Sequence, residues 1–101
     1  MDSLRFHSGV YQDMDAAIEW YEREEPGVGI RFDNEVDQTY LKIHSNPKAW
    51  PKWHKNVRRI AVERFPYNVI YVERSTAIWI VAVAHAKRRP NYWVKRLKDI
   101  P

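Results

Sequence analysis

The densest group of reactive and cationic side chains lies after the last apolar run of the chain. Cleavage of RNA requires a base for the 2′-hydroxyl proton, an acid for the leaving oxygen, and cations that hold the phosphate as charge develops. A window of nine positions, residues 85–93, holds the residue types for all three tasks: His85, Lys87, Arg88, Arg89, Tyr92 and Trp93. His85 and Tyr92 are therefore candidates for proton transfer, and Arg88 is a candidate phosphate clamp. The alternative is that the cations form a solvated charge run and that His85 and Tyr92 only pack.

A second basic group precedes the strand-forming part of the chain and consists of Lys52, Lys55, Arg58 and Arg59. Guanidinium groups can hold a phosphate through two parallel hydrogen bonds. Side chains alternate along a strand, so only one of Arg58 and Arg59 can share a face with the C-terminal group. The neighbouring Trp50 and Trp53 could stack on bases, but closing one end of a core is the alternative that we favour for them.

Composition narrows the classes of function. The formal charge of +4 and the isoelectric point near 9.5 favour an anionic partner, such as nucleic acid or an acidic protein, although solubility alone could explain four surplus charges. The absence of cysteine excludes disulfides and thiolate metal sites. The four histidines lie far apart and the three glycines form no phosphate loop, so we expect neither a metal nor a cofactor. No membrane-spanning run or export signal is visible, which predicts a cytoplasmic protein.

Hydrophobic periodicity predicts the elements that position these residues. Residues 3–7 alternate as a strand does. Apolar residues recur every three or four positions over residues 10–25 and 28–44, and Pro26-Gly27 separates these stretches, which predicts a helical hairpin. Three runs rich in β-branched and aromatic residues follow, at residues 58–65, 67–74 and 77–86. The short turns between these runs predict an antiparallel meander.

Residues 48–56 follow neither period and are predicted as a connection, whereas the segment after Trp93 is predicted as a short helix. With 101 residues and no linker, the chain is expected to form a single domain over residues 1–101. The predicted fold class is α+β: an N-terminal strand, a helical hairpin packed on a small antiparallel sheet, and a short C-terminal helix. The other sheet face is expected to stay partly open and to form, with the C-terminal group, one docking surface for an anion.

The order of residues over nearly the whole chain resembles the toxins of the RelE/ParE superfamily of bacterial type II toxin-antitoxin systems. Four stretches carry this likeness: AIEWYEREEPGVGIRFDNEV at 17–36, NPKAWP at 46–51, RRIAVERFPYNVIYV at 58–72 and IVAVAHAKRRPNYW at 80–93. Their combination is fairly specific. The resemblance implies the α+β fold predicted above and a plasmid stabilization type of system, in which the toxin inhibits growth by acting on a macromolecular target.

The resemblance also implies partners and site residues. A cognate antitoxin would wrap the toxin in a hetero-oligomer and neutralise it. RelE-like members cleave mRNA in the ribosomal decoding site, whereas ParE-like members poison DNA gyrase. By position, Arg59 resembles a basic strand residue of the nucleases. Arg88 and Tyr92 resemble their C-terminal arginine and tyrosine, and His85 lies where several relatives have histidine. The other members of the two basic groups are expected to bind nucleic acid or another target: Lys52, Lys55, Arg58, Lys87, Arg89 and Trp93.

Two positions depart from the nuclease pattern. Asn68 stands where we expect an arginine aimed at the scissile phosphate, and Ala61 stands where some of the nucleases have lysine. The class of activity therefore stays open between a metal-independent ribonuclease and a gyrase poison without catalytic residues. A third possibility is a domain that binds antitoxin and is not toxic.

Overall fold

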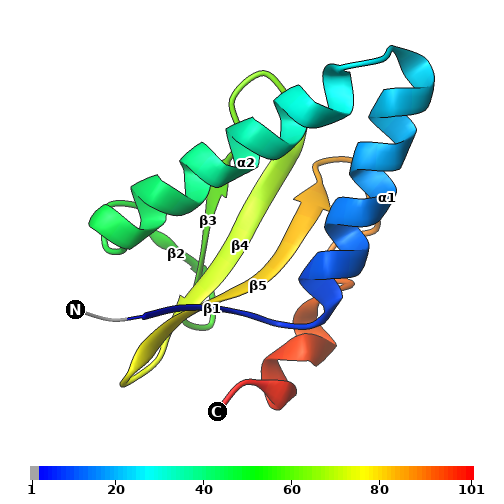
Figure 1. Cartoon of the computed structure of the whole chain (residues 1–101). Coiled ribbons are helices and arrows are strands. Elements are labelled where there is room, and N and C mark those ends of the chain that lie inside the picture. The colour runs from blue at the N-terminus through cyan, green and yellow to red at the C-terminus, as the bar shows by residue number, and fades with distance from the viewer. Residues whose placement is uncertain (1–2) are drawn as a thin grey trace.

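The computed structural model describes residues 3–101 and contains one sheet with two helices on one of its faces (Figure 1). The elements are β1 (Ser3–Phe6), α1 (Gly9–Glu24), α2 (Val28–Ser45), β2 (Lys52–His54), β3 (Val57–Ala61), β4 (Tyr67–Glu73), β5 (Ala77–His85) and a 3-10 helix, η1 (Val94–Asp99). The strand order is β1-β5-β4-β3-β2. The predicted α+β class, the helical hairpin, the meander and the short terminal helix are confirmed.

Strand β1 makes the sheet mixed, because it pairs in parallel with β5. Leu4 lies opposite Ile78, and Phe6 lies opposite Ile80. The other four strands pair antiparallel, and for β3, β4 and β5 this pairing was predicted. Parallel pairing is possible here because the helical hairpin and three strands separate β1 from β5 in the chain, and parallel pairs require a long connection. Since β1 ends at Phe6, the edge of β5 beyond Ile80 has no partner strand within residues 3–101.

Residues 48–56, predicted as a connection, contain the short edge strand β2. Lys52 lies opposite Arg58 and His54 opposite Val57, with a register shift between the two pairs. The prediction was wrong here because a strand of three residues is too short to show a period of two, and the neighbouring proline and lysines are typical of a loop. The turn after β2 places Lys55 in the left-handed region, with a φ of 49°.

The turn between the two helices depends on Gly27 and Glu22. Gly27 has a φ of 93°, a conformation that glycine adopts without a steric penalty. Both carboxylate oxygens of Glu22 accept hydrogen bonds from the Gly27 N–H at 3.1 Å, and Oε1 accepts another from the Ile30 N–H at 3.3 Å. The bond from Gly27, above all, lowers the pKa of Glu22. Glu22 therefore caps the start of α2 from the end of α1.

Apolar side chains pack on both faces of the sheet. The main core lies between the sheet and the helices, and Phe32, Val36 and Ile43 of α2 are fully buried there. The opposite face, called the open face below, is partly covered by Trp93 and Ile100 of the C-terminal segment, residues 86–101. Figure 1 draws this segment in orange and red. It covers part of a sheet face that would otherwise be exposed and leaves hollows beside it.

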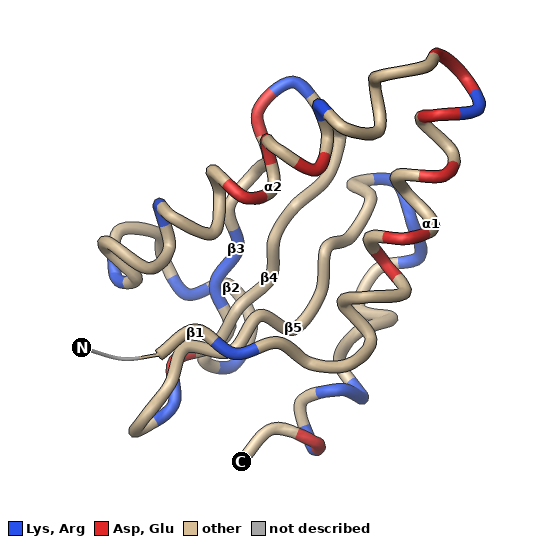
Figure 2. The backbone as a smooth tube through the Cα atoms, in the orientation of Figure 1, with Lys and Arg blue, Asp and Glu red and all other residues tan. Residues whose placement is uncertain are grey.

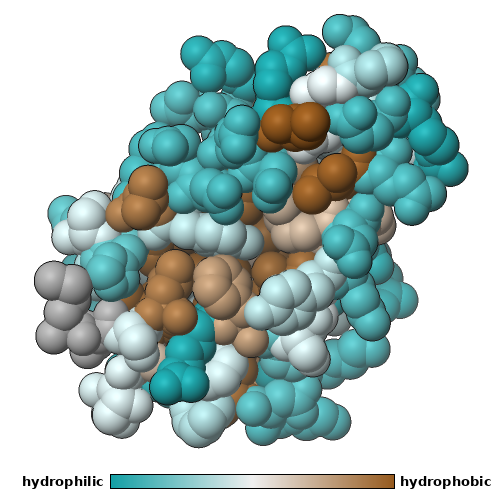
Figure 3. Space-filling view, viewed as in Figure 1, coloured by the Kyte–Doolittle hydropathy of each residue, from teal (hydrophilic) through white to brown (hydrophobic). Residues whose placement is uncertain are grey.

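The helical side keeps large apolar side chains at the surface. Tyr11, Trp20, Ile30 and Leu41 of α1 and α2 are each at least half exposed, and Figure 3 shows brown apolar atoms over and between the helices. Exposed apolar side chains that gather on one side are typical of a surface that binds another protein.

Candidate target-binding site

Alternation along β3 separates its two arginines. Arg59 is exposed and shares the open face with Ile70, its partner on β4. Arg58 lies opposite Tyr71, whose ring belongs to the main core. The Arg58 side chain is 11% exposed, forms an ion pair with Glu73 at 3.3 Å and donates a hydrogen bond to the carbonyl of Trp50. Arg58 therefore holds the loop before β2 in place and lies away from the open face, so its binding to a target stays a prediction.

A groove of about 250 Å³ lies on the open face, between β2 and the C-terminal segment. We call it the Arg59 groove. Its lining includes three arginines, an amide and aromatic rings: Trp53, Arg59, Asn68, Arg88, Arg89 and Tyr92. The strand and the C-terminal segment thus bring Arg59 and Arg88 into one cavity, as expected from the sequence.

Two arginines of the groove lie over aromatic rings. The Arg59 guanidinium carbon is 4.0 Å from the centroid of the Trp53 ring, and that of Arg88 is 4.0 Å from the centroid of the Tyr92 ring. Each contact contributes about 0.5–2 kcal/mol, and it leaves the N–H edge of the guanidinium available for a carboxylate or phosphate. Within residues 3–101, no Asp or Glu forms an ion pair with these two arginines or with Arg89.

His85 borders the same groove, but its ring is directed to the other side of the sheet. Its neighbour Ala84 lies opposite Asn68 on the open face, so His85 faces the helical side with Tyr67. The two rings meet edge to face, with centroids 5.0 Å apart. The Nδ1 atom of His85 accepts a hydrogen bond from the Lys87 N–H at 3.0 Å. The His85 ring is therefore not placed beside Arg59 for proton transfer.

The Tyr92 ring lies under the Arg88 guanidinium, whereas the Tyr92 hydroxyl is buried. The hydroxyl oxygen is buried, and no hydrogen-bond partner for it is found among the described residues. Burial raises the pKa of Tyr92 to about 12, and the negative charge of Asp13 adds to the increase. At neutral pH the phenol is protonated and faces the protein interior, so it is poorly placed to exchange a proton with a ligand in the groove.

A family model and a solved structure match this chain. The model described as "ParE toxin of type II toxin-antitoxin system, parDE" matches residues 4–90. The chain belongs to the ParE toxin family. A solved structure described as the chromosomal ParDE TA system from P. aeruginosa is similar, with a TM-score of 0.77 and 19% identity over 86% of this chain and 98% of that chain. No curated protein matches. The predicted membership of the RelE/ParE superfamily is confirmed.

The remaining predicted binding residues of this ParE toxin-family chain occupy different surroundings. The Trp93 side chain is only 1% exposed and packs against Trp53, with ring centroids 5.6 Å apart. Trp93 lines the groove but exposes little of its surface, and its contact with a target stays a prediction. Lys52, Lys55 and Lys87 are exposed but do not line the Arg59 groove. Their role in target binding stays a prediction.

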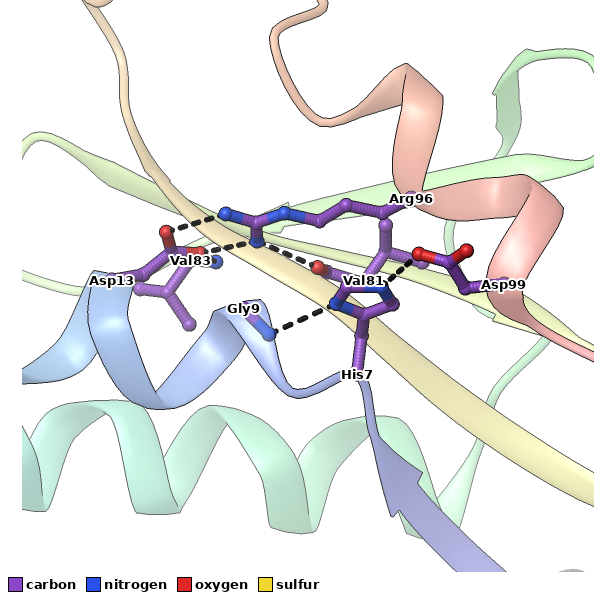
Figure 4. Close-up of polar contacts among 7 residues, drawn as sticks. All are labelled: His7, Gly9, Asp13, Val81, Val83, Arg96 and Asp99. Atoms are coloured by element: carbon purple, nitrogen blue, oxygen red, sulfur yellow. Dashed lines mark hydrogen bonds and ion pairs between the residues drawn. The ribbon is translucent and has the colours of Figure 1, made fainter.

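A buried ion pair fixes the C-terminal segment of the ParE toxin-family chain (Figure 4). Arg96 donates to both carboxylate oxygens of Asp13, at 2.8 and 3.0 Å, and to the carbonyl of Val81 at 3.0 Å. Asp13 also accepts a hydrogen bond from the Val83 N–H at 3.0 Å. Both side chains are close to fully buried, at 12% and 3% exposure. A side chain at position 9 would collide with Arg96, since a Cβ on Gly9 would lie 2.5 Å from the guanidinium carbon.

The position of this pair explains its partners. Val81 and Val83 lie on the part of β5 that extends beyond β1, where one edge of β5 faces no strand among the described residues. Asp13 and Arg96 take the place of a neighbouring strand, because Asp13 accepts from the Val83 N–H and Arg96 donates to the Val81 carbonyl. Next to them, the Nδ1 atom of His7 accepts a hydrogen bond from the Gly9 N–H at 2.9 Å, which leaves the proton of a neutral ring on Nε2. The Nε2 atom lies within hydrogen-bond distance of the Asp99 carboxylate, at 2.8 Å, and this contact links the end of η1 to the residue after β1.

Neither Asp13 nor Arg96 was assigned to a site from the sequence. The signal for Asp13 is its place three residues after Val10 and four before Ala17, on the apolar stripe of α1. A charge on such a stripe requires a buried partner. No comparable signal identifies Arg96 among the other cations of the C-terminal segment.

The modest net charge hides a strong separation of charge. Residues 9–45 contain nine acidic and three basic residues, whereas residues 46–101 contain three acidic and thirteen basic ones, so the two parts carry net charges of −6 and +10. Figure 2 shows red concentrated on the helices and blue on the strands and the C-terminal segment. The Arg59 groove therefore lies in the positive part of the molecule.

Neither a metal site nor a membrane-spanning helix is found among the described residues. Within residues 3–101, no three His, Asp or Glu side chains are grouped closely enough to hold a metal ion. No helix in this range is long and apolar enough to cross a membrane. The Arg59 groove itself presents guanidinium groups and an amide, which are suited to binding an anion.

Proposed function

We propose that this protein is a cytoplasmic toxin that inhibits growth by binding DNA gyrase, and that a cognate antitoxin neutralises it in a hetero-oligomer. The observation that carries the proposal is the Arg59 groove, in which Arg59 and Arg88 rest on rings and have no acidic partner among the described residues. Such preorganised guanidinium groups favour binding to a charged or polar surface. The ParE-like members of the superfamily are the gyrase poisons.

The geometry supports binding over RNA cleavage. A general base must come within hydrogen-bond reach of the proton that it removes. The His85 ring packs on Tyr67 at the helical side, whereas Arg59 lies on the open face. The Tyr92 hydroxyl is buried with a raised pKa. Asn68, where an arginine is expected in the nucleases, leaves the central strand β4 without a cation in the groove.

The charge distribution supports an acidic antitoxin segment as the second partner. The net charge of +10 over residues 46–101 would attract such a segment and speed its association. The solved structure that resembles this chain is described as a toxin-antitoxin system. The exposed apolar side chains of α1 and α2 offer a further area for a protein partner.

The proposal is tested by inducing the protein in bacteria without its neighbouring gene. Growth is expected to stop, and co-expression of the adjacent antitoxin gene is expected to restore it. The double variant Arg59→Ala/Arg88→Ala should relieve the arrest. The matched variant Arg23→Ala/Arg31→Ala removes two exposed arginines from the helices and should remain toxic.

Primer extension on mRNA from the arrested cells distinguishes the two classes of toxin. The proposal predicts no new cuts. Ribosome-dependent cuts that disappear in a His85→Ala variant would contradict it and support a RelE-type ribonuclease. Normal growth of cells that contain soluble wild-type protein would support a domain that binds antitoxin without being toxic.

A further inference from the structure

A second cavity lies on the open face, between the β2–β3 turn, strands β3 and β4, and η1. Its volume is about 470 Å³, and it shares no lining residue with the Arg59 groove. Its floor is apolar. Val57 and Val72, which are opposite each other on β3 and β4, are buried, and Val94 and Leu97 of the C-terminal segment complete the apolar lining. Such a floor favours the burial of an aliphatic side chain from a ligand.

Cations border this floor: Lys55, Arg74, Lys95 and Lys98. In the part of the chain that the structure describes, none of the four forms an ion pair with Asp or Glu. Lys48, by contrast, is neutralised by Glu73 at 3.0 Å. Unneutralised cations around a concave apolar floor focus a positive potential there and favour an anionic ligand.

Lys55 occupies a position that a lysine rarely adopts. It lies in the two-residue turn between His54 and Val57, with a φ of 49°. Glycine or asparagine would adopt this left-handed conformation with less strain. Strain of this kind is often retained at functional sites, where the side chain is needed in that place. Here it brings an exposed ammonium group to the edge of the cavity.

The type of lining indicates the class of ligand. Proteins that bind single-stranded nucleic acid stack the bases on aromatic rings. The Arg59 groove has such rings, but none of the described residues that line the second cavity is aromatic. Lysines, which make up three of its four cations, act as flexible point charges and lack the planar guanidinium fork that binds a phosphate through two hydrogen bonds. Aliphatic contacts with surrounding ammonium groups match an acidic peptide better than they match a nucleic acid.

We propose that this cavity, the Lys55 pocket, docks an acidic peptide segment of a protein partner and takes up an aliphatic side chain of that segment. Charge complementarity would supply the attraction, and the floor formed by Val57, Val72 and Leu97 would select the apolar side chain. The pocket is separate from the Arg59 groove, so this binding does not depend on gyrase inhibition.

Fluorescence anisotropy with the full-length protein tests the proposal. The probe is a fluorescein-labelled octapeptide of alternating glutamate and leucine. The variant Lys55→Glu/Lys98→Glu should weaken its binding by about tenfold or more, since like charges then face each other. The matched variant Arg23→Glu/Arg31→Glu has the same net charge and should bind within about twofold of the wild type. Circular dichroism should give the same spectrum for all three proteins, because each substituted side chain is on the surface.

Two further ligands test the role of the apolar floor and the class of ligand that the pocket prefers. An octapeptide of glutamate alone should bind about tenfold more weakly than the probe, because it cannot fill the floor. Oligothymidylate of eight nucleotides should compete poorly. Equal binding of the all-glutamate peptide, stronger binding of oligothymidylate, or equal losses in the two charge variants would overturn the proposal. The single variant Lys98→Glu, which leaves Lys55 in place, should weaken binding of the probe and keep gyrase inhibition, so failure of the pocket and failure of the proposed function are distinguishable.

Discussion

Arg96 joins the C-terminal segment to α1 and to the unpaired edge of β5, so its replacement should destabilise the whole fold. The variant Arg96→Met preserves the unbranched aliphatic stem of the side chain but removes the guanidinium group and its three hydrogen bonds. It leaves the Asp13 carboxylate, which is 3% exposed, without its counter-charge. Removing one partner of a buried ion pair costs about 3–5 kcal/mol. We expect about 3 kcal/mol, because the released C-terminal segment can open and admit water to Asp13.

Urea unfolding at pH 7, followed by tryptophan fluorescence, measures this loss. A chain of this size has a total stability of about 5–15 kcal/mol, so the midpoint should fall markedly. The slope of the free energy of unfolding against urea concentration should stay unchanged. Arg23→Met is the matched control, because Arg23 forms an exposed pair with Glu19 at 3.8 Å. Such a helix pair contributes about 0.3–0.5 kcal/mol. A loss below about 1 kcal/mol for Arg96→Met would show that the pair with Asp13 does not hold the fold together.

The double variant Asp13→Leu/Arg96→Met separates two roles of the pair. It removes both charges, which often restores stability when a buried pair serves only as an ion pair. Here the Val83 N–H and the Val81 carbonyl would still lose their partners. Each unsatisfied buried group costs about 1–3 kcal/mol. The double variant should therefore remain about 2 kcal/mol or more below the wild type, and full recovery would show that the pair does not cap the edge of β5.

Three further substitutions have expected outcomes. Tyr92→Phe removes a buried hydroxyl that lacks a hydrogen bond among the described residues, so urea unfolding should show a stability within about 0.5 kcal/mol of the wild type or above it, and growth arrest should persist; lost toxicity with normal folding would restore a catalytic role. Gly27→Ala should lower the free energy of unfolding by about 1 kcal/mol, because the cost comes from the φ of 93° and no atom lies within 4 Å of the added Cβ; an unchanged midpoint would contradict this. Burial raises the pKa of Tyr71 to about 12, above its value of about 10 in an unfolded chain, so its contribution is complete below about pH 10 and disappears as the pH rises through 12. Midpoints measured from pH 9 to 12 should therefore fall less steeply in Tyr71→Phe than in the wild type, and parallel curves would exclude this cause.

The regular elements could be predicted because each has a period long enough to read. Helices α1 and α2 each show several repeats of the apolar stripe, and β4 and β5 are runs rich in strand-forming residues. Strand β2 has three residues and a register shift, so no period exists in it. The parallel pairing of β1 with β5 depends on contacts between residues about 74 positions apart, which local patterns do not encode.

The candidate site was predicted in part. Arg59 and Arg88 line one groove, which the alternation of side chains along β3 and the position of the C-terminal group after β5 allowed us to expect. Whether this groove binds a target stays a prediction. The direction of His85 could not be read from composition, because one step along β5 separates the open face from the helical side. The loop after β5 contains Asn91 with a φ of 64°, and such irregular backbone decides which side chains reach the groove. Trp93 follows this loop, and its burial could not be predicted without the course of the loop backbone.

Inhibition of DNA gyrase supercoiling by purified variants shows whether the Arg59 groove acts by binding. Wild-type protein and the double variant His85→Ala/Tyr92→Phe should inhibit supercoiling equally, because binding requires neither the His85 ring nor the Tyr92 hydroxyl. The variant Arg59→Ala/Arg88→Ala should require about tenfold more protein for the same inhibition, since two cations of the groove are lost. Full inhibition by the arginine variant, or loss of inhibition only in the His85→Ala/Tyr92→Phe variant, would contradict the claim that the groove acts by binding.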